Sequence, residues 1–186
     1  MTKETMKAVF LDRDGTINQD DGYTHKIQDF RFLDFAIKGM QRFYNAGYGI
    51  FIITNQSGIA RGYYNMHDIN VLHSYVSEYL RGWGIQIEEF LVCPHHPDYT
   101  GPCNCRKPGN ELLERAIDKY NVQRAGSWLI GDRLSDQLAA TKSGLEFIRI
   151  LGSKDDFPDE TIEARDILEA YNIIQRYSTN VGDIHE

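Results

Sequence analysis

The sequence lacks any apolar run of the roughly 18 residues that a membrane-spanning helix requires, so we expect no membrane partner. Residues 1–15 contain no long apolar core of the kind that directs secretion, and the expected location is therefore the cytoplasm. Positive charge is also scarce: 27 acidic side chains outnumber 20 lysines and arginines, which leaves a net charge of −7. Because a nucleic-acid-binding protein needs a basic face, we expect no nucleic-acid partner.

Internal repeats and low-complexity segments are also absent, and the length suits a single domain over residues 1–186. Short apolar runs alternate with helical patterns along the chain. The predicted strands cover residues 8–11, 48–53, 90–92, 128–130 and 147–151, and the predicted helices cover residues 35–45, 66–80, 112–120, 134–142 and 161–176. This alternation predicts an α/β fold, a Rossmann-like parallel sheet with helices on both faces and no room for a large cap domain.

Polar residues of interest stand just after three of the predicted strands. Asp12, Thr54 and Asp132 each follow an apolar run. In open parallel sheets, ligands bind at the carboxyl ends of the strands. We therefore expect these three side chains to converge, although they are far apart in sequence.

The first of these strands delivers two carboxylates, Asp12 and Asp14, followed by Gly15. A turn there can aim both carboxylates at one ligand. One carboxylate can attack phosphorus while the other manages the proton of the leaving group, and a hard cation would neutralise the charge that repels the nucleophile. The alternative is a solvated acidic turn, which the preceding strand and the following Gly-Thr disfavour.

Cysteine is scarce and clustered, with three residues that all lie within residues 93–105. An odd, clustered set suits metal binding better than a disulfide framework. Cys-x-His followed by Cys-x-Cys supplies four ligands of the kind that a closed tetrahedral zinc site uses. We expect a structural zinc ion in this loop, because protein groups fill all four positions; the alternative is a set of free thiols with surface histidines.

Four ordered segments resemble the motifs of the haloacid dehalogenase superfamily of phosphohydrolases. They are Asp12-Arg13-Asp14-Gly15-Thr16, Thr54-Asn55-Gln56-Ser57-Gly58, Arg106-Lys107-Pro108 and Gly131-Asp132-Arg133-Leu134-Ser135-Asp136. Together they span most of the chain, and four motifs in order are far more specific than any one of them.

The resemblance implies a magnesium-dependent phosphatase with defined residue roles. Asp12 would be the nucleophile, Asp14 the acid and base, and Lys107 the partner of the phosphate and the nucleophile. Thr54, Asn55, Gln56 and Ser57 would hold the phosphoryl group, and Asp12, Asp14 (through its main-chain carbonyl) and Asp132 would bind Mg²⁺. Asp136 would support Asp132 or Lys107. For zinc, the resemblance favours Cys93, His95, Cys103 and Cys105 as ligands, with His96 outside the ligand set.

Two groups of this superfamily carry a zinc loop, and they differ in substrate. One removes the C7 phosphate of D-glycero-D-manno-heptose 1,7-bisphosphate, and the other acts on histidinol phosphate. The runs at residues 12–18 and 54–62 are similar to the heptose group, whereas the short spacing between His95 and Cys103 approaches the histidinol-phosphate group. A small phosphorylated sugar is the expected substrate, and histidinol phosphate remains the alternative.

Without a cap domain, loops must select the substrate. Candidate sugar contacts are Asp20, Asp21, Gly22 and Tyr23, while Arg106 would bind phosphate and Arg133 would meet a second phosphate; for each, the alternative is a solvated loop residue. We expect the protein to be a monomer. A non-catalytic zinc-clamped binding module is the alternative from another class, and a phosphotransferase that shares the first half-reaction is a further one.

Overall fold

A computed structural model describes residues 5–182 and contains a six-stranded sheet in the order β3-β2-β1-β4-β5-β6. The strands are β1 (Ala8–Asp12), β2 (Gly49–Asn55), β3 (Glu89–Cys93), β4 (Trp128–Gly131), β5 (Glu146–Ile150) and β6 (Glu163–Ala164). Every neighbouring pair is parallel. The predicted parallel α/β sheet is therefore confirmed, and the carboxyl ends of the strands lie at one edge.

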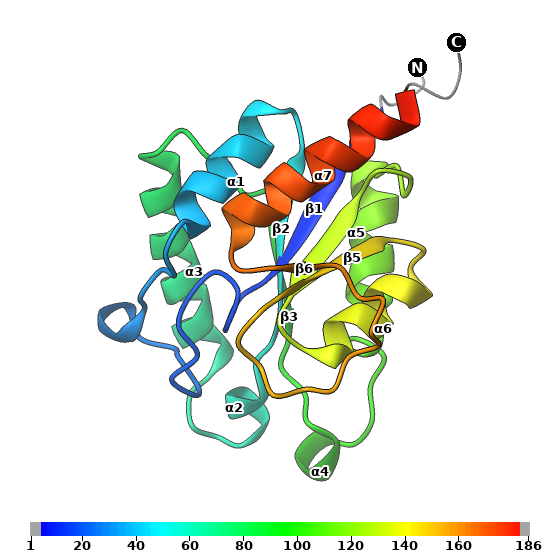
Figure 1. The fold of residues 1–186 in the computed structure, drawn as a ribbon. Coiled ribbons are helices and arrows are strands. Elements are labelled where there is room, and N and C mark those ends of the chain that lie inside the picture. The colour runs from blue at the N-terminus through cyan, green and yellow to red at the C-terminus, as the bar shows by residue number, and fades with distance from the viewer. Residues whose placement is uncertain (1–4, 183–186) are drawn as a thin grey trace.

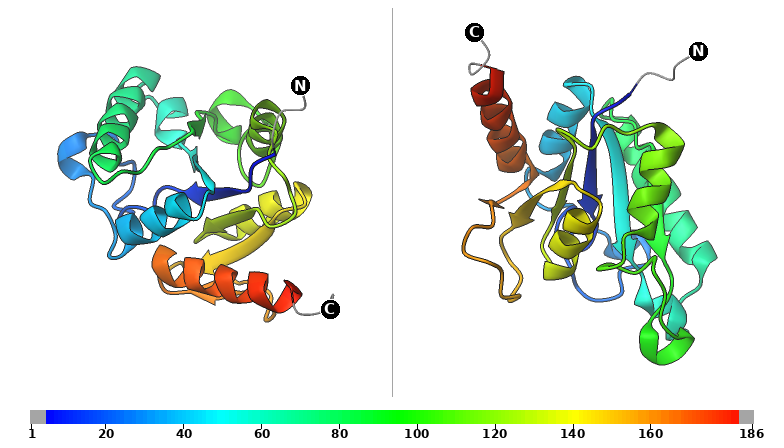
Figure 2. Two further views of the ribbon diagram at one scale, coloured as in Figure 1. Left: turned by 90° about the horizontal axis from the view of Figure 1, so that it is seen from above. Right: turned by 90° about the vertical axis from the view of Figure 1, so that its right-hand side faces the viewer.

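Helices cover both faces of the sheet (Figures 1 and 2). The long helices are α1 (Ala36–Asn45), α3 (Met66–Arg81), α5 (Glu111–Tyr120), α6 (Leu134–Lys142) and α7 (Ile167–Gly182). Three short helices, η1 (Ile27–Asp29), α2 (Ser57–Ala60) and α4 (Pro97–Thr100), lie in the connecting loops. Figure 1 shows α2 and α4 below the sheet, at the end opposite the two termini.

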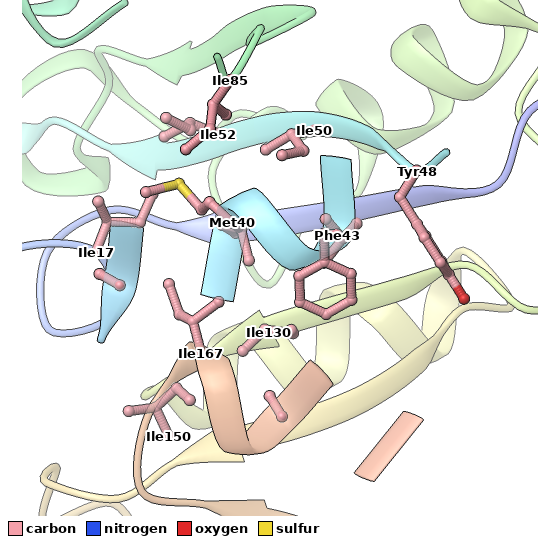
Figure 3. Packing of buried hydrophobic residues seen from close by; sticks show 14 of the residues in the cluster. Ile17, Met40, Phe43, Tyr48, Ile50, Ile52, Ile85, Ile130, Ile150 and Ile167 are labelled. Carbon is pink, nitrogen blue, oxygen red and sulfur yellow. The ribbon is translucent and has the colours of Figure 1, made fainter. Parts of the chain in front are cut away.

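Successive side chains of β2 belong in turn to two hydrophobic cores, one on each face of the sheet. Ile50 and Ile52 belong to the core formed with α1, α3 and α7, where Met40 and Phe43 pack in the same cluster (Figure 3). Residues 51 and 53 belong to the core formed with α5 and α6. Successive side chains of a strand point to opposite faces, so an apolar run without polar interruptions is what a strand covered on both sides requires.

The start of α3 fixes the end of the loop that follows β2. The Asn65 side chain accepts hydrogen bonds from the main-chain N–H groups of His67 (2.8 Å) and Asp68 (3.2 Å). In return, the Asp68 carboxylate accepts from the Asn65 N–H at 2.8 Å. This capping box satisfies donors at the helix N-terminus that have no partner within the helix.

The predicted helix over residues 161–176 is wrong at its start. Glu163 and Ala164 form β6, which pairs with β5, and the helix α7 begins only at Ile167. The Asp166 side chain accepts from the Glu169 N–H at 2.8 Å and marks the true start. A strand of two residues carries no periodic pattern, but the Asp-x-x-Glu spacing at residues 166–169 is a helix-start signal that the prediction overlooked.

No helix within residues 5–182 is both long enough and apolar enough to cross a bilayer.

Candidate active site

The carboxyl ends of β1, β2 and β4 form a cavity of about 540 Å³. Asp12 is the last residue of β1, Thr54 lies near the end of β2, and Asp132 follows β4. The predicted residues Asp12, Asp14, Asp20, Gly22, Tyr23, Thr54, Asn55, Gln56, Ser57, Arg106, Lys107 and Arg133 line this cavity, together with Tyr64, Ser135, Asp136 and Asp155. Asp132 is not among these lining residues and borders a neighbouring hollow instead, but its carboxylate lies within 4.8 Å of that of Asp12, so the strand ends do converge.

Lys107 is a buried ammonium group between two carboxylates. Its Nζ lies 2.5 Å from Asp12 Oδ1 and 2.6 Å from Asp136 Oδ1. It also donates to the main-chain oxygen of Ile53 at 3.0 Å. Burial alone would lower the pKa of Lys107, but the carboxylates of Asp12 and Asp136 outweigh it and hold that pKa above its ordinary value. Lys107 is thus a fixed positive charge beside Asp12.

One ammonium group does not balance the negative charge of this cluster. Oxygens of Asp12, Asp132 and Asp136 lie within 4.8 Å of one another. Burial raises the pKa of Asp12 well above its ordinary value against the opposing charge of Lys107, and Asp136 and Asp132 add to the rise. Burial likewise raises the pKa of Asp132 to about 6. The cluster favours a bound cation, because a cation would offset crowded carboxylates.

Asp132 has an oxygen to offer such a cation. Its Oδ1 is buried and forms no hydrogen bond among the described residues. Gly15 makes room for this carboxylate: a Cβ at that position would lie 2.5 Å from Asp132 Oδ2, and the φ of +85° disfavours any other residue. Oxygen ligands from carboxylates suit Mg²⁺, so the site fits this ion.

Asp14 lies at the edge of the cavity and is held by three side chains. Arg13 Nη2 lies 2.9 Å from each of its oxygens. Asn18 Nδ2 donates to Asp14 Oδ1 at 2.9 Å, and Gln56 Nε2 donates to Asp14 Oδ2 at 3.0 Å. The second carboxylate of the motif is thus fixed by neighbours that face it from two strand ends.

The side chains at the end of β2 have two different sets of hydrogen-bond partners, one within the cavity and one in the main chain of Lys107. Gln56 Nε2 also donates to Thr54 Oγ1 at 2.7 Å, while Tyr64 donates to Gln56 Oε1 at 2.7 Å. Tyr64 approaches so closely because residue 58 is glycine, where a Cβ would overlap the tyrosine ring. Asn55, in contrast, forms both of its side-chain hydrogen bonds with the main chain of Lys107.

Three residues near this site were not predicted to act there. Arg13 is 1% exposed although it is charged, and it contacts His73 on α3. Burial, together with the nearby Arg13, lowers the pKa of His73 to about 3, and burial raises the pKa of Tyr64 to about 12. Arg13 stands inside a recognised motif, but no signal in the sequence joins it to residue 73.

The predicted sugar-contacting residues lie around the mouth of the cavity, with one exception. Asp21 lines a neighbouring hollow of about 1150 Å³ instead. Arg133 and Asp20 border both spaces, and Arg133 Nη2 lies 3.0 Å from Asp20 Oδ2. Tyr23 packs its ring edge against Tyr63 at 4.9 Å between ring centroids.

The four expected zinc ligands form a compact cluster at the end of β3. The sulfur atoms of Cys93, Cys103 and Cys105 lie 3.1–3.8 Å apart, and His95 Nδ1 lies 3.2 Å from Cys105 Sγ and 4.0 Å from Cys93 Sγ. A tetrahedral zinc site with Zn–S bonds of about 2.3 Å has S···S separations of roughly 3.8 Å. The cluster therefore fits a tetrahedral ion such as zinc, whereas the sulfur atoms are too far apart for disulfides.

His96 lies outside this cluster and contacts Arg61 instead of the cysteines. Its Nε2 lies 3.1 Å from Arg61 Nη2, and its side chain accepts from the Asp98 N–H at the start of α4. Arg61 also donates to the Tyr99 hydroxyl at 2.9 Å, with its guanidinium 4.7 Å from that ring centroid. Arg61 thus joins the loop after β2 to the loop that carries the cysteine cluster.

Three comparisons place this chain near known phosphatases. A family model described as HAD-hydrolase-like matches residues 104–172. D-glycero-beta-D-manno-heptose-1,7-bisphosphate 7-phosphatase of Haemophilus ducreyi is 40% identical over 145 residues, 75% of this chain and 80% of the relative. D-glycero-alpha-D-manno-heptose-1,7-bisphosphate 7-phosphatase of Photorhabdus laumondii is 40% identical over 150 residues, 78% of this chain and 82% of the relative.

A solved structure agrees with this similarity. D,D-heptose 1,7-bisphosphate phosphatase from B. bronchiseptica, crystallised with magnesium and phosphate, is 28% identical and has a TM-score of 0.84. The match covers 92% of this chain and 99% of that one.

Proposed function

The chain belongs to the haloacid dehalogenase-like hydrolases, among the heptose-1,7-bisphosphate 7-phosphatases, and from this membership we propose that it removes the C7 phosphate of D-glycero-D-manno-heptose 1,7-bisphosphate to give heptose 1-phosphate. One observation carries the proposal. Asp12 stands at the end of a buried strand, beside the Lys107 ammonium group and two further carboxylates, in a cavity of about 540 Å³. A relative named for the β anomer and a relative named for the α anomer are both 40% identical to this chain, so the proposal extends to either anomer.

In the first step, an Asp12 oxygen attacks phosphorus and forms the Asp12–phosphorus bond while the bond to the C7 oxygen breaks. Asp14 gives its proton to the departing C7 oxygen, so an alcohol leaves rather than an alkoxide. Lys107 is positioned to offset negative charge on Asp12 and on the phosphoryl oxygens.

In the second step, water attacks phosphorus and Asp14 accepts the proton of that water. The bond from phosphorus to Asp12 breaks, which releases phosphate, restores the Asp12 carboxylate and leaves Asp14 protonated for the next turnover. Asp14 must therefore stay within reach of the phosphorus in both steps, and its contacts with Arg13, Asn18 and Gln56 support that requirement.

Asp12, Asp132 and the main chain of Asp14 would hold Mg²⁺. The buried, unpaired Oδ1 of Asp132 supports this assignment. When bound, the ion neutralises negative charge between the nucleophile and the phosphate. Asp136 contacts Lys107 instead and would fix that ammonium group.

Zinc at Cys93, His95, Cys103 and Cys105 would be structural. The ligand cluster ends two residues before Lys107, and Arg106 donates to the His95 carbonyl oxygen at 3.2 Å. A zinc ion would therefore hold the segment that carries Arg106 and Lys107, and it would contribute folding free energy to a loop with little regular structure. A loop that depends on three thiolates needs a reducing compartment, which agrees with a cytoplasmic location.

Asp20, Gly22, Tyr23, Arg106 and Arg133 border the cavity and are the proposed contacts for the sugar and its second phosphate. The names of the relatives favour heptose bisphosphate over histidinol phosphate.

The direct test is to incubate the protein with heptose 1,7-bisphosphate and Mg²⁺ and to follow the reaction by phosphorus NMR. We expect the C7 phosphate signal to disappear while the C1 phosphate signal remains. Loss of the C1 phosphate, or no phosphate release from any phosphorylated compound, would contradict the proposal. The second outcome would favour a non-catalytic binding module.

A further inference from the structure

Arg13 is an arginine buried at the centre of a polar network. It is 1% exposed, and its guanidinium contacts both oxygens of Asp14. Its Nη2 also donates to the main-chain oxygen of Thr24 at 2.6 Å, and its Nη1 lies 3.2 Å from His73 Nε2. A buried charge is tolerated only when it is paired and hydrogen-bonded, so each of these contacts bears on where the guanidinium can lie.

The contact with His73 has a defined direction. A guanidinium group has no acceptor atom, so His73 Nε2 must accept the hydrogen bond and the ring proton must sit on Nδ1. The ring itself is held in place, because it is 5% exposed and stacks on Phe90 with 4.3 Å between centroids. His73 lies in the middle of α3, which packs into the core on one face of the sheet. His73 is thus a firmly held acceptor for the Arg13 guanidinium.

A second donor to Asp14 is held in a comparable way. Gln56 donates to Asp14 Oδ2, and the Gln56 amide is itself fixed by Tyr64 and Thr54. The carboxylate of Asp14 therefore lies between two donors that are each oriented by a further residue.

We propose that His73 is a positioning residue for the phosphatase reaction: it orients the Arg13 guanidinium, which in turn holds Asp14 where it can transfer a proton. The inference rests on the proposed function, in which Asp14 is the acid and base. Without an acceptor at residue 73, Arg13 Nη1 loses its buried partner. Asp14 and the main-chain oxygen of Thr24 then hold the guanidinium alone, and its orientation toward both Asp14 oxygens is less strictly fixed.

The two half-reactions depend on Asp14 in different ways. An alkyl phosphate needs the Asp14 proton in the first step, since its leaving alkoxide is strongly basic. p-Nitrophenyl phosphate needs no proton in that step, because nitrophenolate is a weak base. Both substrates need Asp14 to take the proton of water in the second step. Misplacement of Asp14 therefore slows the first step only for the alkyl substrate and the second step for both.

The test compares His73→Met with His73→Gln, which have side chains of similar length and differ in the acceptor atom. We expect His73→Met to lower kcat for heptose 1,7-bisphosphate about tenfold or more with KM little changed, since general acid–base catalysis contributes about 10²–10⁴-fold in full. We expect His73→Gln to restore most of this loss. With p-nitrophenyl phosphate, His73→Met should give a rapid burst of nitrophenolate followed by slow turnover. Asp14→Asn should show the same burst.

The burst amplitude counts folded, reactive sites, so it separates a positioning defect from loss of fold. If His73→Met does not fold, Arg13→Lys keeps the charge, loses the two-oxygen contact and should show the same pattern. An unchanged kcat in folded His73→Met, or equal losses in His73→Met and His73→Gln, would overturn the inference and leave the proposed function standing. A wild-type protein that hydrolyses neither substrate would overturn the proposed function itself.

Discussion

The side chain of Asn55 is joined to the main chain of Lys107 by two hydrogen bonds. Asn55 Nδ2 donates to the Lys107 carbonyl oxygen at 3.1 Å, and the Lys107 N–H donates to Asn55 Oδ1 at 3.1 Å. This pair connects the end of β2 to the segment that follows the cysteine cluster. Asn55, predicted from the sequence as a phosphate contact, thus has both side-chain groups engaged with the residue whose ammonium group lies beside Asp12.

Replacement of Asn55 by alanine should lower kcat/KM about 10- to 100-fold, because the segment carrying Lys107 loses both anchoring bonds and small displacements of catalytic groups are costly. Steady-state kinetics on heptose 1,7-bisphosphate would measure the effect. Asn70→Ala is the matched control, since Asn70 is an exposed asparagine on α3. Equal activity of the two variants would contradict this role for Asn55.

Replacement of Asp12 by asparagine should reduce kcat at least about 10³-fold, because the amide cannot form the covalent phosphoryl intermediate. The fold should persist, since Asp12→Asn removes one of three crowded carboxylates while Asp136 still pairs with Lys107. Circular dichroism would check the fold, and rapid quench with labelled substrate would check for protein-bound phosphate. Retained turnover on the sugar substrate would disprove Asp12 as nucleophile.

Metal-free protein should lose stability as pH rises through about 6. Burial raises the pKa of Asp132 from 3.8 to about 6 in the folded state. Asp132 contributes its full stabilisation at pH values below its pKa in the unfolded chain, and this contribution is lost at pH values above its pKa in the folded protein. The free energy of unfolding then falls by an amount on the order of 3 kcal/mol. Mg²⁺ binds the ionised carboxylate, so its addition should raise Tm more at about pH 7.5 than at about pH 5. Thermal melts with and without Mg²⁺ would measure this.

The control for that experiment is Asp132→Asn, which should show a flatter dependence of Tm on pH and little response to Mg²⁺. A Mg²⁺-induced rise in Tm that is the same at both pH values would contradict the assignment of Asp132.

Replacement of His95 by alanine should abolish stoichiometric zinc binding, whereas His96→Ala should keep it. Only His95 lies within the cysteine cluster, and His96 contacts Arg61 instead. Metal analysis of the purified variants would decide the matter. The His95 variant should also have a lower Tm and a lower kcat/KM, because the segment before Lys107 loses its anchor. Zinc retained in His95→Ala and lost in His96→Ala would reverse the ligand assignment.

Much of the site could be predicted because it depends on strand ends. Asp12, Thr54 and Asp132 each follow an apolar run and lie at or next to the end of a strand, and a parallel sheet brings such ends to one edge. The cysteine cluster was predictable for a different reason, since its ligands are close in sequence and carry a recognisable spacing.

Contacts between side chains from distant segments could not be predicted in the same way. His73 meets Arg13 because the long Arg13 side chain reaches from the turn after β1 to α3, and a histidine in an apolar helical pattern gives no sign of a polar partner. Arg61 meets His96 because two loops lie side by side, and loop conformation has no periodic signal. The two residues of β6 could not be predicted because they derive their structure from pairing with β5, whereas the start of α7 has a sequence signal in the Asp-x-x-Glu spacing at residues 166–169.

The most direct test of the proposed activity compares kcat/KM for heptose 1,7-bisphosphate, as both anomers, with kcat/KM for histidinol phosphate in the presence of Mg²⁺. We predict a preference of about 100-fold or more for at least one heptose anomer, which corresponds to roughly 2.7 kcal/mol of transition-state stabilisation. A comparable preference for histidinol phosphate would contradict the proposed activity and would mean that the short spacing between His95 and Cys103 identifies the substrate better than the run at residues 54–62.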